Sequence, residues 1–161
     1  MSQHTFRPLS AKDQKWVSKY TAEHWGAEVV VVHQAKYWPA ECPGFVGEDQ
    51  GNVVGWITYQ IEGDSCEIIT LNSLVEGRGI GTALINLVKY EALKSGCTRL
   101  WLITTNNNTQ ALRFFQRIGF RFSGLNVGAV DEDRKLKPEI PLVDEAGIPI
   151  RDELVLEIAL K

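Results

Sequence analysis

The most constraining feature of this sequence is a glycine-rich stretch between an apolar segment and a helix-like segment. It reads Gly77-Arg78-Gly79-Ile80-Gly81-Thr82 and follows Glu67-Ile68-Ile69-Thr70-Leu71. Alternate glycines let a backbone pass close to a bulky anion, and a helix that starts there directs unpaired N–H groups at that anion. The stretch predicts a strand, a diphosphate-binding loop and a helix, although a tight strand-to-helix turn could need these glycines for packing alone.

Length and charge limit the class of protein. The 161 residues suit a single domain, residues 1–161, with enough buried surface for a full core. A formal net charge of −3 gives no basic field, so we expect neither nucleic-acid nor membrane binding. The N-terminus has no apolar signal region, and the longest apolar run, near Val29 to Val32, is too short to span a bilayer. These features predict a cytoplasmic protein.

The three cysteines indicate neither a disulfide framework nor a metal site. Cys42, Cys66 and Cys97 are odd in number, widely spaced and free of any CxxC pattern. We expect reduced, mostly buried thiols and no bound metal.

The N-terminal part predicts a strand, a helix and then a meander. Phe6 to Leu9 suits a first strand, and Ser10 is an N-cap candidate for a helix from about Ala11 to His24. Val29 to Trp38 leaves strand and coil both open. The meander is predicted from three strand-like segments, which are Gly44 to Glu48, Val53 to Ile61 and Cys66 to Leu71.

The second half predicts a β-α-β crossover followed by a second helix and late strands. A helix from about Gly81 to Lys94, with Gly96 as its C′ residue, leads to an apolar strand from Leu100 to Thr104. Asn108 is placed to cap a short helix that Gly119 ends. The remaining expected segments are two late strands at Leu125 to Val130 and Leu154 to Leu160, a charged mobile loop at Asp131 to Pro138, and a turn-rich return from Pro141 to Pro149.

Two nucleotide-binding folds are disfavoured by the same glycines. A dinucleotide-binding GxGxxG would need a glycine where Thr82 stands and an acidic residue after the next strand. A P-loop would need a lysine before its hydroxyl residue, and Gly81-Thr82 has none.

With these excluded, the chain resembles the GNAT superfamily of acyl-CoA-dependent N-acetyltransferases. Its Q/R-x-x-G-x-G/A motif is matched at Glu76-Gly77-Arg78-Gly79-Ile80-Gly81, and its N-x-x-A-x-x-x-Y-x-x-x-G-F motif is matched from Asn108 to Phe120. The resemblance implies an α/β (α+β) fold with a mixed, mostly antiparallel sheet, a splayed central parallel strand pair and flanking helices. It also implies that acetyl-CoA is held by Leu71, Ser73, Leu74, Gly77, Arg78, Gly79, Ile80, Gly81, Thr82, Asn108, Ala111 and Phe115.

The sequence departs from the family pattern at two positions. Glu76 stands where Gln or Arg is usual, and a carboxylate that pointed inward would repel a phosphate, so we expect it to point outward. Phe115 stands where the family commonly has a tyrosine proposed to protonate the departing CoA thiolate. A thiol with a pKa near about 8.5 is already a good leaving group, so catalysis is weakened in principle and not excluded.

The resemblance implies direct transfer to an amine, which must first lose a proton. Glu67 is the best candidate base, since it precedes the cofactor loop on one strand, with the same parity as Ile69 and Leu71. Glu67 could equally form a surface ion pair, and His33 and His24 are rival bases. Tyr37, Trp38 and Trp56 are candidates to line the acceptor pocket, and a bulge near Leu71 to Ser73 could offer an oxyanion donor.

Two functions follow as hypotheses. The first is an N-acetyltransferase that moves an acetyl group from acetyl-CoA to a primary amine of a small molecule or peptide. The alternative, suggested by Glu76 and Phe115, is a non-catalytic acyl-CoA-binding or regulatory module. Pairing of C-terminal strands is compatible with a homodimer.

Overall fold

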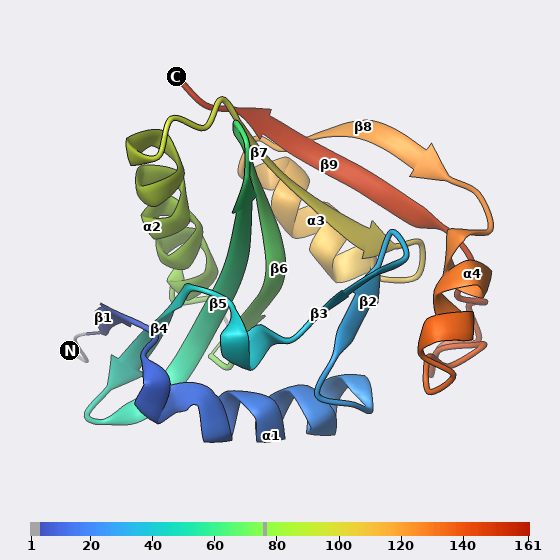
Figure 1. The fold of residues 1–161 in the computed structure, drawn as a ribbon, viewed down its shortest axis with the longest axis horizontal. Helices are drawn as coiled ribbons and strands as arrows, with labels where there is room; N and C mark the ends of the chain where they lie inside the picture. The colour runs from blue at the N-terminus through green and yellow to red at the C-terminus, as the bar shows by residue number, and fades with distance from the viewer. Residues whose placement is uncertain (1–3, 76) are drawn as a thin grey trace.

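The computed structural model describes residues 4–75 and 77–161. Its main sheet contains β1 (Thr5–Pro8), β4 (Gly44–Asp49), β5 (Asn52–Glu62), β6 (Ser65–Ser73), β7 (Arg99–Thr105), β8 (Arg121–Asn126) and β9 (Glu153–Ala159). The helices are α1 (Gln14–Trp25), α2 (Ile80–Lys94), α3 (Thr109–Arg117) and α4 (Ala129–Leu136), and β2 (Val30–Val32) with β3 (Ala35–Tyr37) forms a separate hairpin (Figure 1).

The fold class predicted from the sequence is confirmed. The seven-stranded sheet has the order β1-β4-β5-β6-β7-β9-β8, and β6 and β7 are its parallel neighbours. The other neighbouring strands of this sheet pair antiparallel. The parallel pair exists because α2 carries the chain from the end of β6 back to the start of β7, which is a β-α-β crossover.

The parallel strands part before they end. Within the described residues, their register runs from Ser65↔Arg99 to Ile68↔Leu102, although β6 continues to Ser73 and β7 to Thr105. β7 pairs with β9 on its other edge along its whole length, from Arg99↔Ala159 to Thr105↔Glu153, so beyond Leu102 this is the strand pairing that continues. The carboxyl ends of β6 and β7 therefore splay at the centre of the sheet.

The two faces of the sheet are covered by different elements. Side chains alternate along β5, so Trp56 lies on one face, where it meets the rings of Trp16, Tyr20 and Trp25 from α1. Its neighbour Ile57 lies on the other face, in the core that α2 and α3 complete. Helices thus cover both faces of the sheet, and the splay between β6 and β7 opens between them.

A β-bulge in β6 changes which residues share a face. Thr58 pairs with Thr70 and Tyr59 pairs with Ile68, so Ile69 is an extra residue in β6. The expectation that Glu67 and Leu71 share one parity is wrong, because the extra residue reverses the alternation between them. The irregularity also lies at Ile69 and not near Leu71 to Ser73, where we expected it.

Two predicted segments need correction, and one open segment is settled. The charged stretch from Asp131 to Pro138 was expected as a mobile loop, but most of it belongs to helix α4. Val130 and Asp133 of this helix are buried, and so is Lys137, its C-cap. The strand expected from Leu125 to Val130 is β8, which runs earlier and ends at Asn126. The segment from Val29 to Trp38 is the β2–β3 hairpin. Its turn lacks glycine, so the sequence gives no hairpin signal there.

Candidate active site

The loop after β6 has the backbone that the glycine motif requires. Gly77 and Gly79 have φ values of 73° and 70°, in the left-handed region that favours glycine, and Gly79 is the N-cap of α2. A Cβ at either position would meet no atom within 4 Å, so open space lies beside both. The first amides of α2 point toward this end of the helix, as an anion site needs. Glu76 lies outside the described residues, so its expected orientation stays a prediction.

The neighbouring motif residues hold the loop against the rest of the protein. Ile80 and Gly81 are buried, and a Cβ on Gly81 would come 3.1 Å from the Phe114 ring of α3. Thr82 is half-buried, and Arg78 is exposed on the loop. Gly81 thus lets the first turn of α2 approach α3, which is the packing role that the sequence left open for these glycines.

The three residues expected at the end of β6 lie next to this loop. Leu71 is half-buried against the core, and Leu74 is exposed. The Ser73 hydroxyl donates a hydrogen bond to the Val75 carbonyl at 3.0 Å. These residues line the β6 side of the splay, where the resemblance expects the cofactor.

The second motif confirms one prediction and explains one departure. Asn108 caps α3, because its side-chain oxygen accepts a hydrogen bond from the Ala111 amide at 3.3 Å, and its amide donates to the Thr104 hydroxyl at 3.1 Å. Phe115 is buried between Phe114 and Phe120, with ring centroids 5.2 and 5.3 Å away. Phe115 therefore serves the core and supplies no hydroxyl.

Glu67 is buried and forms a hydrogen-bonded cluster with two half-buried side chains, His33 and Tyr37, near or on the β2–β3 hairpin. Only 5% of Glu67 is exposed. One carboxylate oxygen lies 3.0 Å from His33 Nε2, and the other accepts a hydrogen bond from the Tyr37 hydroxyl at 3.0 Å. The Tyr37 hydroxyl also lies 3.2 Å from His33 Nε2. The candidate base Glu67 and its rival His33 therefore belong to one hydrogen-bonded group.

The cluster changes the acidity of its members. The hydrogen bond with Glu67 raises the pKa of His33, and burial opposes this rise. Burial raises the pKa of Tyr37, and the charge and hydrogen bond of Glu67 add to it. His33 is thus a stronger base than an ordinary histidine, while Tyr37 keeps its proton and can donate it in a hydrogen bond.

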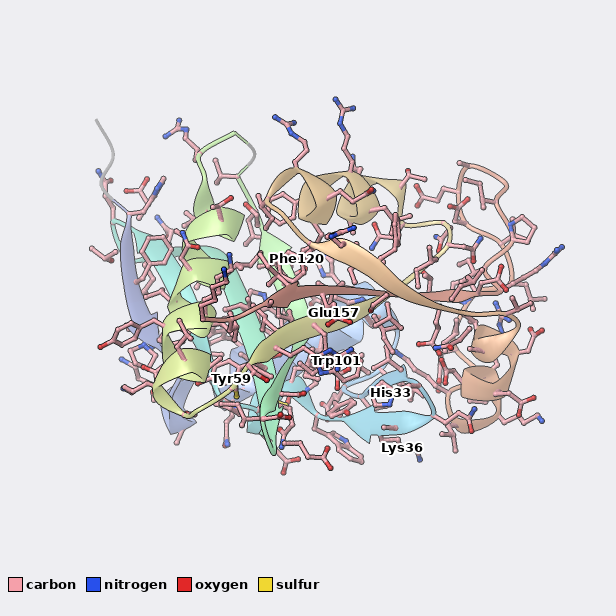
Figure 2. All side chains as sticks on the ribbon, turned by 90° about the horizontal axis from the view of Figure 1, so that it is seen from above. His33, Lys36, Tyr59, Trp101, Phe120 and Glu157 are labelled. Carbon is pink, nitrogen blue, oxygen red and sulfur yellow. The ribbon has the colours of Figure 1, made fainter. Side chains whose placement is uncertain are left out.

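Trp101 of β7 forms the wall beside this cluster. Trp101 pairs with Glu67 in the parallel register, and its ring centroid lies 5.6 Å from that of His33. The Arg99 guanidinium lies 4.7 Å from the Trp101 ring and forms an ion pair with Glu157 at 3.1 Å. Figure 2 shows His33 on the hairpin next to Trp101, with Glu157 beyond it. The cluster lies where β6 and β7 still pair, just before they splay.

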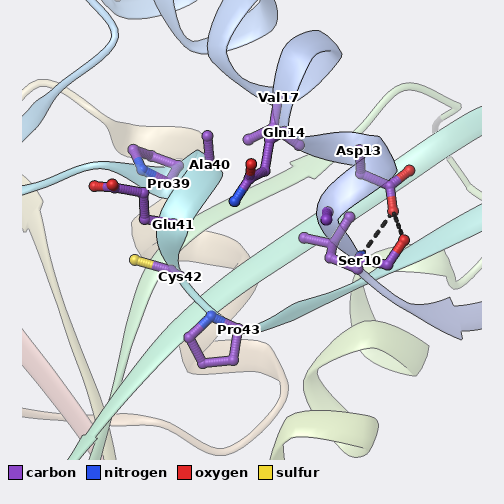
Figure 3. A pocket seen from close by; sticks show the side chains of 11 residues that line it. Ser10, Asp13, Gln14, Val17, Pro39, Ala40, Glu41, Cys42 and Pro43 are labelled. Atoms are coloured by element: carbon purple, nitrogen blue, oxygen red, sulfur yellow. Dashed lines mark hydrogen bonds between the residues drawn. The ribbon is translucent and has the colours of Figure 1, made fainter.

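Of two cavities among the described residues, one is lined by the turn of the hairpin that carries His33. One of about 340 Å³ lies between the start of α1 and the segment Pro39 to Pro43, and Cys42 lines it (Figure 3). Burial raises the pKa of this thiol to about 11, with smaller contributions from the charges of Glu41 and Glu67. The other, of about 470 Å³, is lined by His33, Gln34, Glu153 and the start of α4. The second cavity therefore offers room for a small molecule at the His33 side of the cluster.

The remaining candidates lie elsewhere. His24 is stacked on Tyr20 of the same helix, with centroids 3.9 Å apart. Trp56 is completely buried under α1 and lines neither cavity, whereas Trp38 is exposed. The sequence gave no reason to join His33 and Tyr37 to Glu67, because they are 34 and 30 residues away from it.

The described residues contain neither a metal-binding cluster nor a membrane-spanning helix. Within residues 4–75 and 77–161, no group of three or more His, Cys, Asp or Glu side chains is arranged to hold a metal ion. In the same part of the chain, no helix has the length and apolar character needed to cross a bilayer.

Comparisons with known proteins identify the family of the chain. The model of the acetyltransferase (GNAT) family matches residues 13–120. YdhI, an uncharacterized protein of Bacillus subtilis, is 42% identical over 140 residues, covering 86% of this chain and 88% of YdhI. YxbD, an uncharacterized protein of the same organism, is 44% identical over 141 residues, covering 87% of this chain and 89% of YxbD.

A solved structure shows the same fold. A GNAT family acetyltransferase from Elizabethkingia anophelis with acetyl-CoA bound superposes with a TM-score of 0.70 at 18% identity, over 98% of both chains. The family match spans most of the sequence, and both Bacillus relatives match along nearly their whole length. The chain therefore belongs to the acetyltransferase (GNAT) family.

Proposed function

We propose that this protein is an N-acetyltransferase that moves an acetyl group from acetyl-CoA to a primary amine. The observation that carries the proposal is the hydrogen-bonded group of the buried Glu67 with His33 and Tyr37, which lies where the parallel strands β6 and β7 begin to splay. Membership of the family and the acetyl-CoA in the Elizabethkingia relative support the choice of donor.

The residues of the splay and the loop fit acetyl-CoA. The open space beside Gly77 and Gly79, with the amides at the start of α2, suits the diphosphate. We assign the pantetheine side to Leu71, Ser73, Leu74 and the start of α3, which includes Asn108 and Ala111, with Arg78 and Thr82 at the loop. Bound acetyl-CoA supplies a thioester whose acetyl carbon is open to attack by a neutral amine.

The cluster supplies the base that this chemistry needs. An alkylamine is protonated near pH 7, so its lone pair becomes available only after a proton leaves. His33 and Glu67 together accept this proton, since Glu67 raises the basicity of the imidazole and stabilises its charged form. The Tyr37 hydroxyl fixes the orientation of the Glu67 carboxylate. The transfer then forms one C–N bond and breaks one C–S bond.

The test is release of free CoA thiol from acetyl-CoA with a panel of primary amines, followed by mass spectrometry of the product. We expect amine-dependent turnover that falls by about 10² to 10⁴ in Glu67→Gln and in His33→Ala, as for loss of a general base. Binding of acetyl-CoA, measured by a thermal shift, should change little in both variants. Glu157→Gln is the matched control, because Glu157 lies on the same face but outside the cluster, and it should keep its activity.

A non-catalytic acyl-CoA-binding module is the second candidate. It is favoured by Phe115, which is buried in the core and lacks the hydroxyl common at this position. Saturable binding of acetyl-CoA without turnover of any amine in the panel would select this candidate and reject the enzyme.

A further inference from the structure

The turn that carries His33 has an unusual backbone. Val32 pairs with Ala35, so His33 and Gln34 are the two residues that connect β2 to β3. Their φ values are 39° and 62°, both in the left-handed region. Two-residue hairpin turns with positive φ at both positions strongly favour Asn-Gly, Asp-Gly or Gly-Gly, because other side chains crowd the backbone there. This turn has none of these residues, so something outside the hairpin must hold it.

Two buried carboxyl groups hold it. The His33 amide donates to both oxygens of Glu153 at 3.1 and 3.2 Å, and the Gln34 amide donates to Asp133 Oδ1 at 2.9 Å. Glu153 comes from β9 and Asp133 from α4, and they are 1% and 2% exposed. The turn amides have no ladder partner in a two-residue hairpin, so the carboxyl groups supply the acceptors that the hairpin itself does not offer.

The two carboxyl groups lie side by side and affect each other. Burial and a hydrogen bond with Asp133 together raise the pKa of Glu153 to about 7, against the opposing effect of the hydrogen bond from the His33 amide. Neither carboxyl forms an ion pair within the described residues. On the hairpin, Asp133 and Glu153 therefore bind mainly the backbone amides of the turn.

His33 is held at two points on opposite sides of its Cα. Its amide is fixed by Glu153, and its imidazole reaches Glu67 at 3.0 Å. A hairpin of two three-residue strands is marginal by itself. Without the carboxyl pair, the left-handed turn would relax toward more favourable dihedrals, and the ring would leave Glu67.

We propose that Asp133 and Glu153 are positioning residues that fix the turn so that the His33 imidazole stays on Glu67. The proposal rests on the proposed function, since it assigns the two carboxyl groups to the base of that reaction. They act through the backbone of the hairpin and need not touch either substrate.

The first test removes the acceptors in Glu153→Leu and in Asp133→Ala. Amide hydrogen exchange at His33 and Gln34 should rise about tenfold, as for loss of one hydrogen bond, while exchange in α2 and β7 stays unchanged. The NMR signals of the His33 ring should move toward those of an exposed histidine. The rate constant kcat should fall about tenfold or more, with the KM for acetyl-CoA unchanged, because only the base is misplaced.

Three further variants separate positioning from simple stability. Gln34→Gly makes the turn favourable without help, so it should restore the ring signals and most of kcat when it is added to Asp133→Ala. Glu157→Gln on β9 and Asp131→Asn on α4 are controls from the same elements and should change none of these readouts. If Glu153→Leu does not fold, Glu153→Gln replaces it, and a smaller rise in exchange at the same two amides is expected.

The outcomes are distinct. Unchanged exchange at the turn, or an equal rise throughout the protein with no rescue by Gln34→Gly, would overturn the positioning role. Exchange and ring signals need no turnover, so they remain decisive even if the protein proves not to transfer acetyl groups. Failure of the proposed function would appear instead as acetyl-CoA binding without turnover of any amine in the wild type, and full activity in Glu67→Gln would reject the cluster as the base.

Discussion

Asp13 provides the sharpest test of how this fold is held together. Its carboxylate is 3% exposed and accepts hydrogen bonds from both terminal nitrogens of Arg7 at 2.8 and 2.9 Å. It also accepts from the Trp16 ring at 2.8 Å and from the Ser10 amide at 2.9 Å, and so ties β1 to the start of α1. Asp13→Asn keeps the size of the side chain but removes the charge and turns an N–H group toward other donors.

The expected loss is about 3 kcal/mol of unfolding free energy. Breaking a buried ion pair by removing one partner costs about 3 to 5 kcal/mol. The lower end applies because the Arg7 side chain is 30% exposed, so water can solvate it after the change. The hydrogen bonds around Asp13 share one charge, so their separate values do not add.

Urea unfolding at pH 7 measures this loss, with Asp131→Asn as the matched control. Asp131 also pairs with an arginine, Arg134, at 2.7 Å, but its carboxylate is 67% exposed. An exposed pair contributes about 0 to 1 kcal/mol, so the control should lose far less. A loss in Asp13→Asn no larger than that in Asp131→Asn would refute the argument from burial.

The pH dependence of stability gives a second measurement on the same variant. The Arg7 hydrogen bonds hold the pKa of Asp13 well below its usual value. This contribution is therefore present above the unfolded pKa of about 3.9 and is lost as the pH falls through the folded pKa. The difference in unfolding free energy between the wild type and Asp13→Asn should become smaller in acid. A difference that stays constant with pH would show that the charge of Asp13 does not stabilise the protein through Arg7.

Three further predictions concern the site and the sheet that carries it. Gly55→Ala should cost about 1 to 3 kcal/mol in urea unfolding, because its Cβ would come 2.8 Å from a backbone oxygen of β6. Thr70→Val should cost about 1 to 3 kcal/mol, because it leaves the buried Thr58 hydroxyl without its partner at 2.6 Å, and adding Thr58→Val should recover part of this loss. Glu67→Gln should lower the pKa of His33 in an NMR titration, because the largest cause of its raised value is removed.

Each of these has an outcome that would contradict it. A Gly55→Ala protein as stable as the wild type would mean that β6 and α2 can move apart freely. A double threonine variant that loses the sum of both single losses would show that the two hydroxyls act independently. An unchanged His33 titration in Glu67→Gln would place the imidazole away from Glu67 in solution.

Much of the fold could be predicted because its signals are local. Gly77 and Gly79 adopt a left-handed φ, which glycine allows because it has no Cβ. Asn108 caps α3 by accepting a hydrogen bond from the amide of Ala111, three residues away. Strand, loop and helix each depend on residues that are adjacent in the sequence. Alternation and capping therefore carried enough information to place them.

Helix α4 shows where local signals fail. Its buried positions are Val130 and Asp133, and the buried Lys137 follows as the C-cap, so two of the three residues on this side are charged. The apolar periodicity that reveals a helix is therefore missing, and the segment resembles a solvated loop. The hairpin turn fails for a similar reason, since His33 and Gln34 are not turn-forming residues and need distant carboxyl groups to hold them.

The sequence by itself determined the glycine-rich loop, the crossover around it and the family, because each rests on short-range spacing. Only the tertiary structure decided that Glu67 meets His33 and Tyr37, and that Asp133 and Glu153 support the turn. Those contacts join residues from 30 to 120 positions apart. No local pattern encodes these contacts, because they form only when the sheet, the hairpin and α4 pack together and bury the carboxyl groups of Glu67, Asp133 and Glu153.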